Sequence, residues 1–79
     1  MNTIQAAWQS YQDQVVPKDA PKTQITETRR AFYAGCQTIL GITYAIGDDS
    51  ISEDAGVQMI ETLHQECELF LKGIRNGVN

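Results

Sequence analysis

Two long stretches of apolar residues with helical spacing constrain the fold of this chain more than any other feature. In the range 20–46, apolar side chains recur every three or four residues, and the same spacing returns in the range 53–75. This period places the apolar side chains along one side of an α-helix. Gly47 is typical of the residue that follows a helix, and the short link after it predicts an antiparallel hairpin.

A shorter helix is predicted before the hairpin, over about 3–16. Pro17 ends this helix because proline lacks the N–H that a helix interior requires. Its apolar side chains are spaced by four, three and four residues, in the order Ile4, Trp8, Tyr11 and Val15. This spacing predicts one apolar face. We expect Trp8, together with Phe32 from the range 20–46, to lie in the core.

The sequence leaves two candidate starts for each long helix. Asp19 and Thr23 are rival N-caps for the range 20–46. Ser50 could open a capping box that Glu53 completes, whereas Ser52 is followed directly by two acidic residues that suit a helix N-terminus. Both pairs of alternatives remain open at the level of sequence.

The range 20–46 is apolar over more than one face, although a monomeric hairpin needs only one. Gly35 and Gly41 interrupt it, and glycine inside a helix costs about 1 kcal/mol relative to alanine. Such glycines indicate close approach of another helix. We therefore predict an all-α protein in which a short N-terminal helix and a long antiparallel helical hairpin assemble into a homo-oligomeric helical bundle.

Composition bounds the class of protein. A chain of 79 residues without repeat or linker is expected to form one domain, residues 1–79, and 42% hydrophobic residues argue against disorder. A net charge of −4 argues against general nucleic-acid binding, which requires a basic surface. No apolar run is long enough for a membrane span, and the first residues lack the pattern of a signal peptide, so a cytoplasmic location is expected.

Positive charge is concentrated in one short region. Four of the six Lys and Arg residues lie between 18 and 30, whereas residues 48–68 carry seven acids and neither Lys nor Arg. Basic side chains near a helix start favour binding of an anion, and arginine adds a fork that fits phosphate. Neighbouring tyrosines could stack on a base. The predicted ligand-binding residues are Tyr11, Lys18, Lys22, Arg29, Arg30 and Tyr33.

An alternative role for the basic cluster is internal ion pairing. Glu27, Asp19 or a carboxylate of the range 53–75 could neutralise the arginines without any ligand. Arg29 falls on the helical stripe that contains Phe32, so we expect it to point toward an interface and not freely into water. The sequence does not decide between a ligand and a carboxylate of the protein itself.

Cys36, His64 and Cys67 form a second candidate cluster, because folding the hairpin about its link brings them level. Three readings stay open: a metal site, which would lack an obvious fourth ligand, a disulfide, and two buried free thiols beside a flanking histidine. We predict the last of these, with no metal and no cofactor. His64 has no plausible nucleophile and orienting acid beside it, so no enzymatic activity is predicted.

Several segments resemble a group of small tailed-phage proteins of unknown function. The first runs from Tyr11 to the Pro-Lys-Asp-Ala-Pro of residues 17–21. Gln24, Glu27 and the Arg-Arg-Ala-Phe-Tyr-Ala-Gly of residues 29–35 follow it, and the last is Ser-Glu-Asp at residues 52–54. In size, helical hairpin and basic-aromatic end, the chain also resembles the phage sponge proteins that counter CBASS and Thoeris defences. That resemblance implies an oligomer that holds a nucleotide signal between subunits by means of arginines, lysines and tyrosines.

Three functional hypotheses follow. The first is a cytoplasmic binding protein that sequesters an anionic small molecule, a nucleotide second messenger of host antiviral defence. The second is an inhibitor or adaptor that binds a host protein through the first helix or the acidic face of the range 53–75. The third is a minor structural component of a phage particle.

Overall fold

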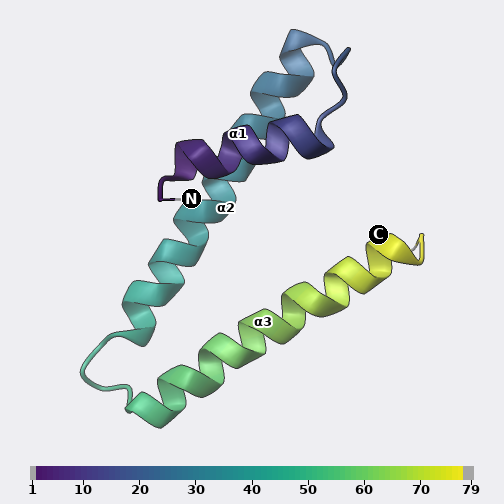
Figure 1. Cartoon of the computed structure of the whole chain (residues 1–79). Helices are drawn as coiled ribbons and strands as arrows, with labels where there is room; N and C mark the ends of the chain where they lie inside the picture. The colour runs from purple at the N-terminus through teal and green to yellow at the C-terminus, as the bar shows by residue number, and fades with distance from the viewer. Residues whose placement is uncertain (1, 78–79) are drawn as a thin grey trace. The chain divides into compact units, whose positions relative to one another are not determined.

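The computed structural model describes residues 2–77, and these form three α-helices without any β-strand (Figure 1). α1 spans Ile4–Val15, α2 spans Lys22–Ile46 and α3 spans Glu53–Arg75. The predicted all-α class is confirmed.

The chain divides into two compact units, Met1–Ile42 and Thr43–Asn79. The division falls inside α2, so that the first unit contains α1 and most of α2, and the second contains the last turn of α2 with α3. Each unit is described by itself. The antiparallel hairpin, the single-domain organisation and the assembly into a homo-oligomer stay predictions.

The core of the first unit is built around Trp8 of α1, which is only 2% exposed. Its ring centroid lies 5.6 Å from that of Phe32 on α2, in an edge-on arrangement, and 6.0 Å from that of Tyr11. The Tyr11 and Phe32 rings are 5.5 Å apart, so the three rings join α1 to α2. The prediction that Trp8 lies in the core is confirmed, whereas Phe32 is only half-buried.

Neither residue proposed from the sequence forms the N-cap of α2. The helix begins at Lys22, and the carbonyl of Pro21 accepts the N–H of Ile25 at 3.1 Å. Asp19 lies in the preceding turn, and Thr23 is already the second helical residue. Proline suits the helix entry because its fixed φ is compatible with the first turn and no donor is lost there.

In the second unit, Ser52 is the N-cap of α3. Its hydroxyl accepts the N–H of Ala55 at 3.1 Å. The rival capping box at Ser50 is wrong, because the Ser50 N–H donates to Oδ1 of Asp48 at 2.8 Å and forms part of the turn before the helix. The acids of the first turn and the bases of the last turn of α3 suit the helix dipole.

The glycine that marks a close helix contact is Gly56, on the first turns of α3. A Cβ atom there would lie 3.2 Å from Cγ2 of Ile46, the last residue of α2, and Gly56 is buried. Within the first unit no helix approaches Gly35 or Gly41 closely, and approach by a helix of another subunit stays a prediction. A Cβ at either position would meet no described atom within 4 Å.

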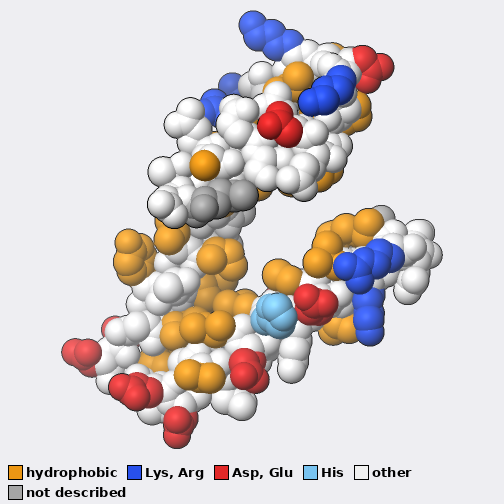
Figure 2. Space-filling view, in the orientation of Figure 1, with side chains coloured by type: hydrophobic (Ala, Val, Ile, Leu, Met, Phe, Trp, Pro, Cys, Tyr) orange, Lys and Arg blue, Asp and Glu red, His pale blue; other side chains and the backbone are white. Residues whose placement is uncertain are grey.

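Much of the apolar surface of α3 is exposed. The stripe predicted from the sequence is present on the helix, but Val57, Ile60, Phe70 and Ile74 are between 49% and 58% exposed. Figure 2 shows hydrophobic side chains at the surface along α3. Within the second unit, the N-terminus of α3 is capped and its apolar stripe remains largely exposed. In the range 2–77, no helix has the length and hydropathy that crossing a membrane requires.

Replacement of Trp8 by alanine is expected to lower the free energy of unfolding by about 3–5 kcal/mol, because it empties the one fully buried aromatic position of the first unit. Urea denaturation followed by far-UV circular dichroism measures the change. Trp8→Phe should recover a large part of the loss. Val15→Ala on the same helix, at a side chain that is 58% exposed, should change stability by less than about 0.5 kcal/mol. A Trp8→Ala variant as stable as the wild type would contradict this view of the core.

The pKa of Asp48 lies below its ordinary value, first because its carboxylate accepts the backbone N–H of Ser50 and then because it also bonds the Ser50 hydroxyl. The ionised carboxylate therefore stabilises the fold above the unfolded pKa, near 3.9, and this contribution is lost as the pH falls through the lower folded value. An NMR titration of the Asp48 carboxyl carbon should give a lower pKa in the folded chain than in urea. Ser50→Ala, which keeps the N–H, should move the pKa only part of the way back. Equal values in the folded and unfolded chain would refute the turn bond.

Candidate anion-binding site

An open hollow of about 380 Å³ lies along the first half of α2. Its lining residues alternate between spacings of one and three, which keeps them on one face over two turns of the helix. We call it the basic hollow, and its lining residues are Ile25, Thr26, Arg29, Arg30 and Tyr33. All five belong to the first unit, so the site is formed within one compact body.

Arg29 is held beside the aromatic ring of Tyr33, one turn further along α2. Its Cζ atom lies 5.2 Å from the ring centroid, within the range of a cation–π contact. Arg29 is exposed in the single chain, and its position at an interface between helices or subunits stays a prediction. The contact orients the guanidinium along the wall of the hollow while it remains in contact with water.

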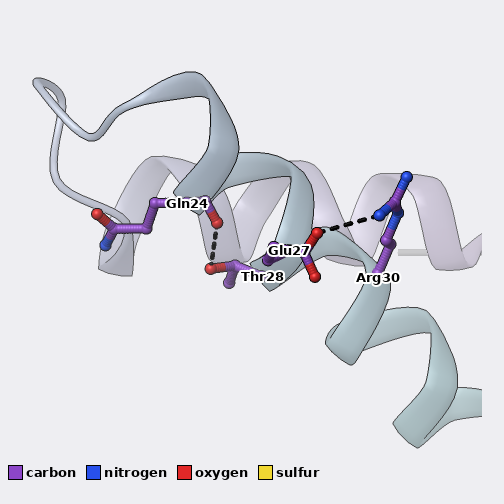
Figure 3. A network of polar contacts seen from close by, with 4 residues as sticks. All are labelled: Gln24, Glu27, Thr28 and Arg30. Carbon is purple, nitrogen blue, oxygen red and sulfur yellow. Dashed lines mark hydrogen bonds and ion pairs between the residues drawn. The ribbon is translucent and has the colours of Figure 1, made fainter.

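Arg30 makes an ion pair with Glu27, one turn earlier (Figure 3). Nη1 of Arg30 donates to Oε1 of Glu27 at 3.0 Å, and the two side chains are 73% and 64% exposed. Internal pairing with Glu27, which the sequence left as an alternative to ligand binding, thus occurs for Arg30. Such an exposed pair contributes only about 0–1 kcal/mol, and guanidinium has five N–H donors, so other donors of Arg30 remain for a second acceptor.

The neighbouring polar groups of this turn are satisfied within the helix. The hydroxyl of Thr28 donates to the carbonyl of Gln24 at 2.7 Å, one turn earlier (Figure 3). This bond occupies the hydroxyl hydrogen of Thr28. The lining of the basic hollow itself contains four side chains that can donate a hydrogen bond, namely Thr26, Arg29, Arg30 and Tyr33.

Three of the six residues predicted to bind a ligand lie outside the lining of the basic hollow. Tyr11 is on α1 and takes part in the ring contacts of the core. Lys18 lies in the turn before α2, and Lys22 is the first residue of α2; both are exposed. Arg29 is two turns beyond Lys22, roughly 10 Å along the axis, so the free N–H groups of the helix start do not share the hollow with it. The ligand-binding role of all six residues stays a prediction.

Ile25 and Thr26 also line the hollow, and neither was predicted to do so from the sequence. Both lie one turn before the arginines, at the i−4 positions of Arg29 and Arg30. Helical spacing from the arginines is the signal that could have identified them. Together with the ring of Tyr33 they add apolar contact area to a site whose donors are cationic, so the hollow can hold an anion attached to a flat or apolar group.

The cysteine and histidine cluster is not established by the structure. Both cysteines are free thiols; Cys36 is half-buried and Cys67 is exposed, so the expectation that both are buried is wrong for Cys67. Cys36 belongs to the first unit and the other two residues to the second, so their convergence stays a prediction. His64 instead lies beside Glu68, with 3.8 Å between Nε2 and Oε1. Across residues 2–77, no three His, Cys, Asp or Glu side chains are grouped closely enough to hold a metal ion.

A second, apolar hollow lies further along the first unit, with a volume of about 540 Å³. It is formed where the start of α1 meets the middle of α2, and we call it the apolar groove. Its lining residues are Ile4, Phe32, Gly35, Cys36, Ile39 and Leu40. None of them is charged, so this groove suits an apolar side chain and not an anion.

Comparison with known proteins gives no relative from which a function could be transferred. No protein-family model, no curated protein and no solved structure matches the chain. The resemblance to small tailed-phage proteins therefore stays an expectation from the sequence, and the functional argument depends on the geometry of the basic hollow.

Proposed function

We propose that this chain is a non-enzymatic binding protein that sequesters an anionic small molecule at the basic hollow. The observation that carries the proposal is that Arg29, Arg30 and the ring of Tyr33 line one hollow. The resemblance to phage sponge proteins suggests which anion: a nucleotide second messenger of host antiviral defence, held in the cytoplasm of an infected cell.

The charges around the hollow favour an anion. Among the residues that the structure describes, Arg29 makes no ion pair; its contact is with the Tyr33 ring, which leaves its N–H groups available. Arg30 shares one donor with Glu27 and keeps others. Hydrogen bonds from two guanidinium groups to one phosphate are charge-assisted, and the planar fork matches the spacing of phosphate oxygens.

The uncharged part of the lining favours an organic ligand over a bare ion. The apolar side chain of Ile25 and the methyl group of Thr26 lie beside the arginines, and Tyr33 adds the edge and face of a ring. A nucleotide carries both chemistries that this lining accommodates, a phosphate and a flat base that stacks on aromatic or guanidinium planes.

We further propose that the protein acts as a homo-oligomer. A hollow formed by a single helix covers only one side of a ligand, whereas small-molecule sites bury most of the ligand surface. A second copy would supply the missing wall. The exposed apolar side chains of α3 and of the second half of α2, such as Ile39 at 50% and Leu40 at 46%, provide surface for such an assembly.

The apolar groove favours a second candidate function, that of an adaptor or inhibitor that binds a host protein. Its uncharged lining and volume of about 540 Å³ would accept the apolar face of a partner helix. In that case the partner would contact the middle of α2, and the arginines would contribute solubility and pairing only.

Binding of nucleotides tests the first proposal. Isothermal titration against cyclic dinucleotides, cyclic trinucleotides and cyclic ADP-ribose isomers should identify a ligand that binds the wild type. Arg29→Ala and Arg30→Ala should each weaken it by about 10-fold or more, because each removes a charged donor worth about 1.5–3 kcal/mol.

Lys72→Ala is the matched control, since it removes one positive charge from a residue that does not line the hollow. Its affinity should equal that of the wild type. Absence of binding to every nucleotide, or equal binding by the wild type and Arg29→Ala, would overturn the proposal. If the chain binds no nucleotide but captures a host protein in stoichiometric amount, the function as an adaptor or inhibitor would be favoured.

Assembly is tested by sedimentation equilibrium at micromolar concentration, where the wild type should form a discrete oligomer. Ile60→Glu places a charge on the exposed apolar stripe of α3 and should shift the equilibrium toward monomer by about 10-fold or more. Gln65→Glu adds the same charge at an exposed polar position and should leave assembly unchanged. A wild-type chain that stays monomeric throughout would contradict the oligomer.

A further inference from the structure

We infer that Glu27 is a specificity-determining residue of the basic hollow. Its negative charge weakens the binding of doubly charged phosphomonoesters more than that of singly charged phosphodiesters. The inference rests on the proposed function, because it concerns the charge of the ligand that the hollow would hold. Glu27 is not part of the lining itself, but it contacts Arg30, which is.

The Glu27 carboxylate lies against one of the two arginines of the hollow. Its Oε1 atom lies 3.0 Å from Nη1 of Arg30, and Arg30 lines the hollow. An anion bound by the remaining donors of Arg30 would therefore be separated from a negative charge by one guanidinium group and the hydrogen bonds on its two sides. The two arginines bring two positive charges to the site, and Glu27 reduces the sum to a single positive charge.

The ion pair between Glu27 and Arg30 is exposed. Both side chains are mostly in water, so the attraction between them is weak and no buried charge results from removing either one. Glu27→Gln keeps the shape and the ability to accept a hydrogen bond from Arg30 while it removes the charge. Its effect on a ligand is therefore mainly a change in electrostatic potential at the site.

The effect of the Glu27 charge on binding increases with the charge of the ligand. The energy of an ion in a given potential is proportional to its charge, so a dianion responds twice as strongly as a monoanion. At pH 8 a phosphomonoester is almost entirely a dianion, because its second pKa is near 6, whereas a phosphodiester carries one charge. We take the Glu27 carboxylate to lie roughly 6–7 Å from the bound phosphate, in a site open to water. Removal of its charge should then tighten the binding of a monoanion roughly 3-fold and that of a dianion roughly 10-fold.

The inference is tested by isothermal titration at pH 8 and low salt, with a 3′,5′-cyclic mononucleotide and the 5′-monophosphate of the same nucleoside. The base and sugar are matched, so that the ligands differ mainly in phosphate charge. Glu27→Gln should tighten the cyclic ligand roughly 3-fold and the 5′-monophosphate roughly 10-fold. Asp13→Asn, which removes the same charge from an exposed α1 residue that pairs with neither arginine, should tighten the binding of both ligands less than Glu27→Gln does.

Each failure has its own signature. Equal tightening of both ligands, or none, would overturn the role of Glu27 as a charge selector while the binding function stood. Binding of neither ligand by the wild type and by Glu27→Gln would overturn the inference, whereas the binding function itself would fall only if the cyclic dinucleotides, cyclic trinucleotides and cyclic ADP-ribose isomers also failed to bind. Circular dichroism of both variants should match the wild type, because both positions are exposed.

Discussion

The packing of Trp8 against Phe32 is the contact on which the rest of the first unit depends. It is the point where α1 and α2 meet, and Trp8 is the one large side chain among the described residues that is almost completely removed from water. The ring contacts continue from Phe32 to Tyr33, at 6.3 Å, and from Tyr33 to Arg29. Burial of one indole thus leads, through two neighbouring rings, to the orientation of a guanidinium in the basic hollow.

The helices could be predicted from the sequence because their apolar residues recur with the helical period. The caps were predicted less well, since Ser50 and Ser52 both match local cap patterns and only the turn made by Asp48 decides between them. Gly35 and Gly41 were predicted as contact positions and Gly56 was not, although a glycine in a helix shows the same local pattern whether or not a neighbour approaches it. That distinction depends on tertiary contacts, which a single sequence does not contain.

The residues of the candidate site could likewise be predicted only where contacts are local in sequence. Arg29, Arg30 and Tyr33 were found because they lie close in sequence and at helical spacing. Lys18 and Lys22 are nearly as close to the arginines in sequence, but neither lines the hollow. Lys18 lies in the turn before α2, and Lys22 lies two helical turns before Arg29. Proximity along the chain becomes proximity in space only within one face of one helix, where residues three and four apart are neighbours.

Ligand binding and assembly would be coupled if a second copy completes the basic hollow. A ligand that binds only the assembled form stabilises that form by mass action, and the assembled form in turn binds the ligand more tightly by the same factor. The open hollow on one helix and the exposed apolar stripe of α3 then have a common explanation. In such an assembly the proposed site would gain its second wall from the same association that would remove the apolar stripe from water, so hydrophobic burial would supply much of the free energy that holds the anion.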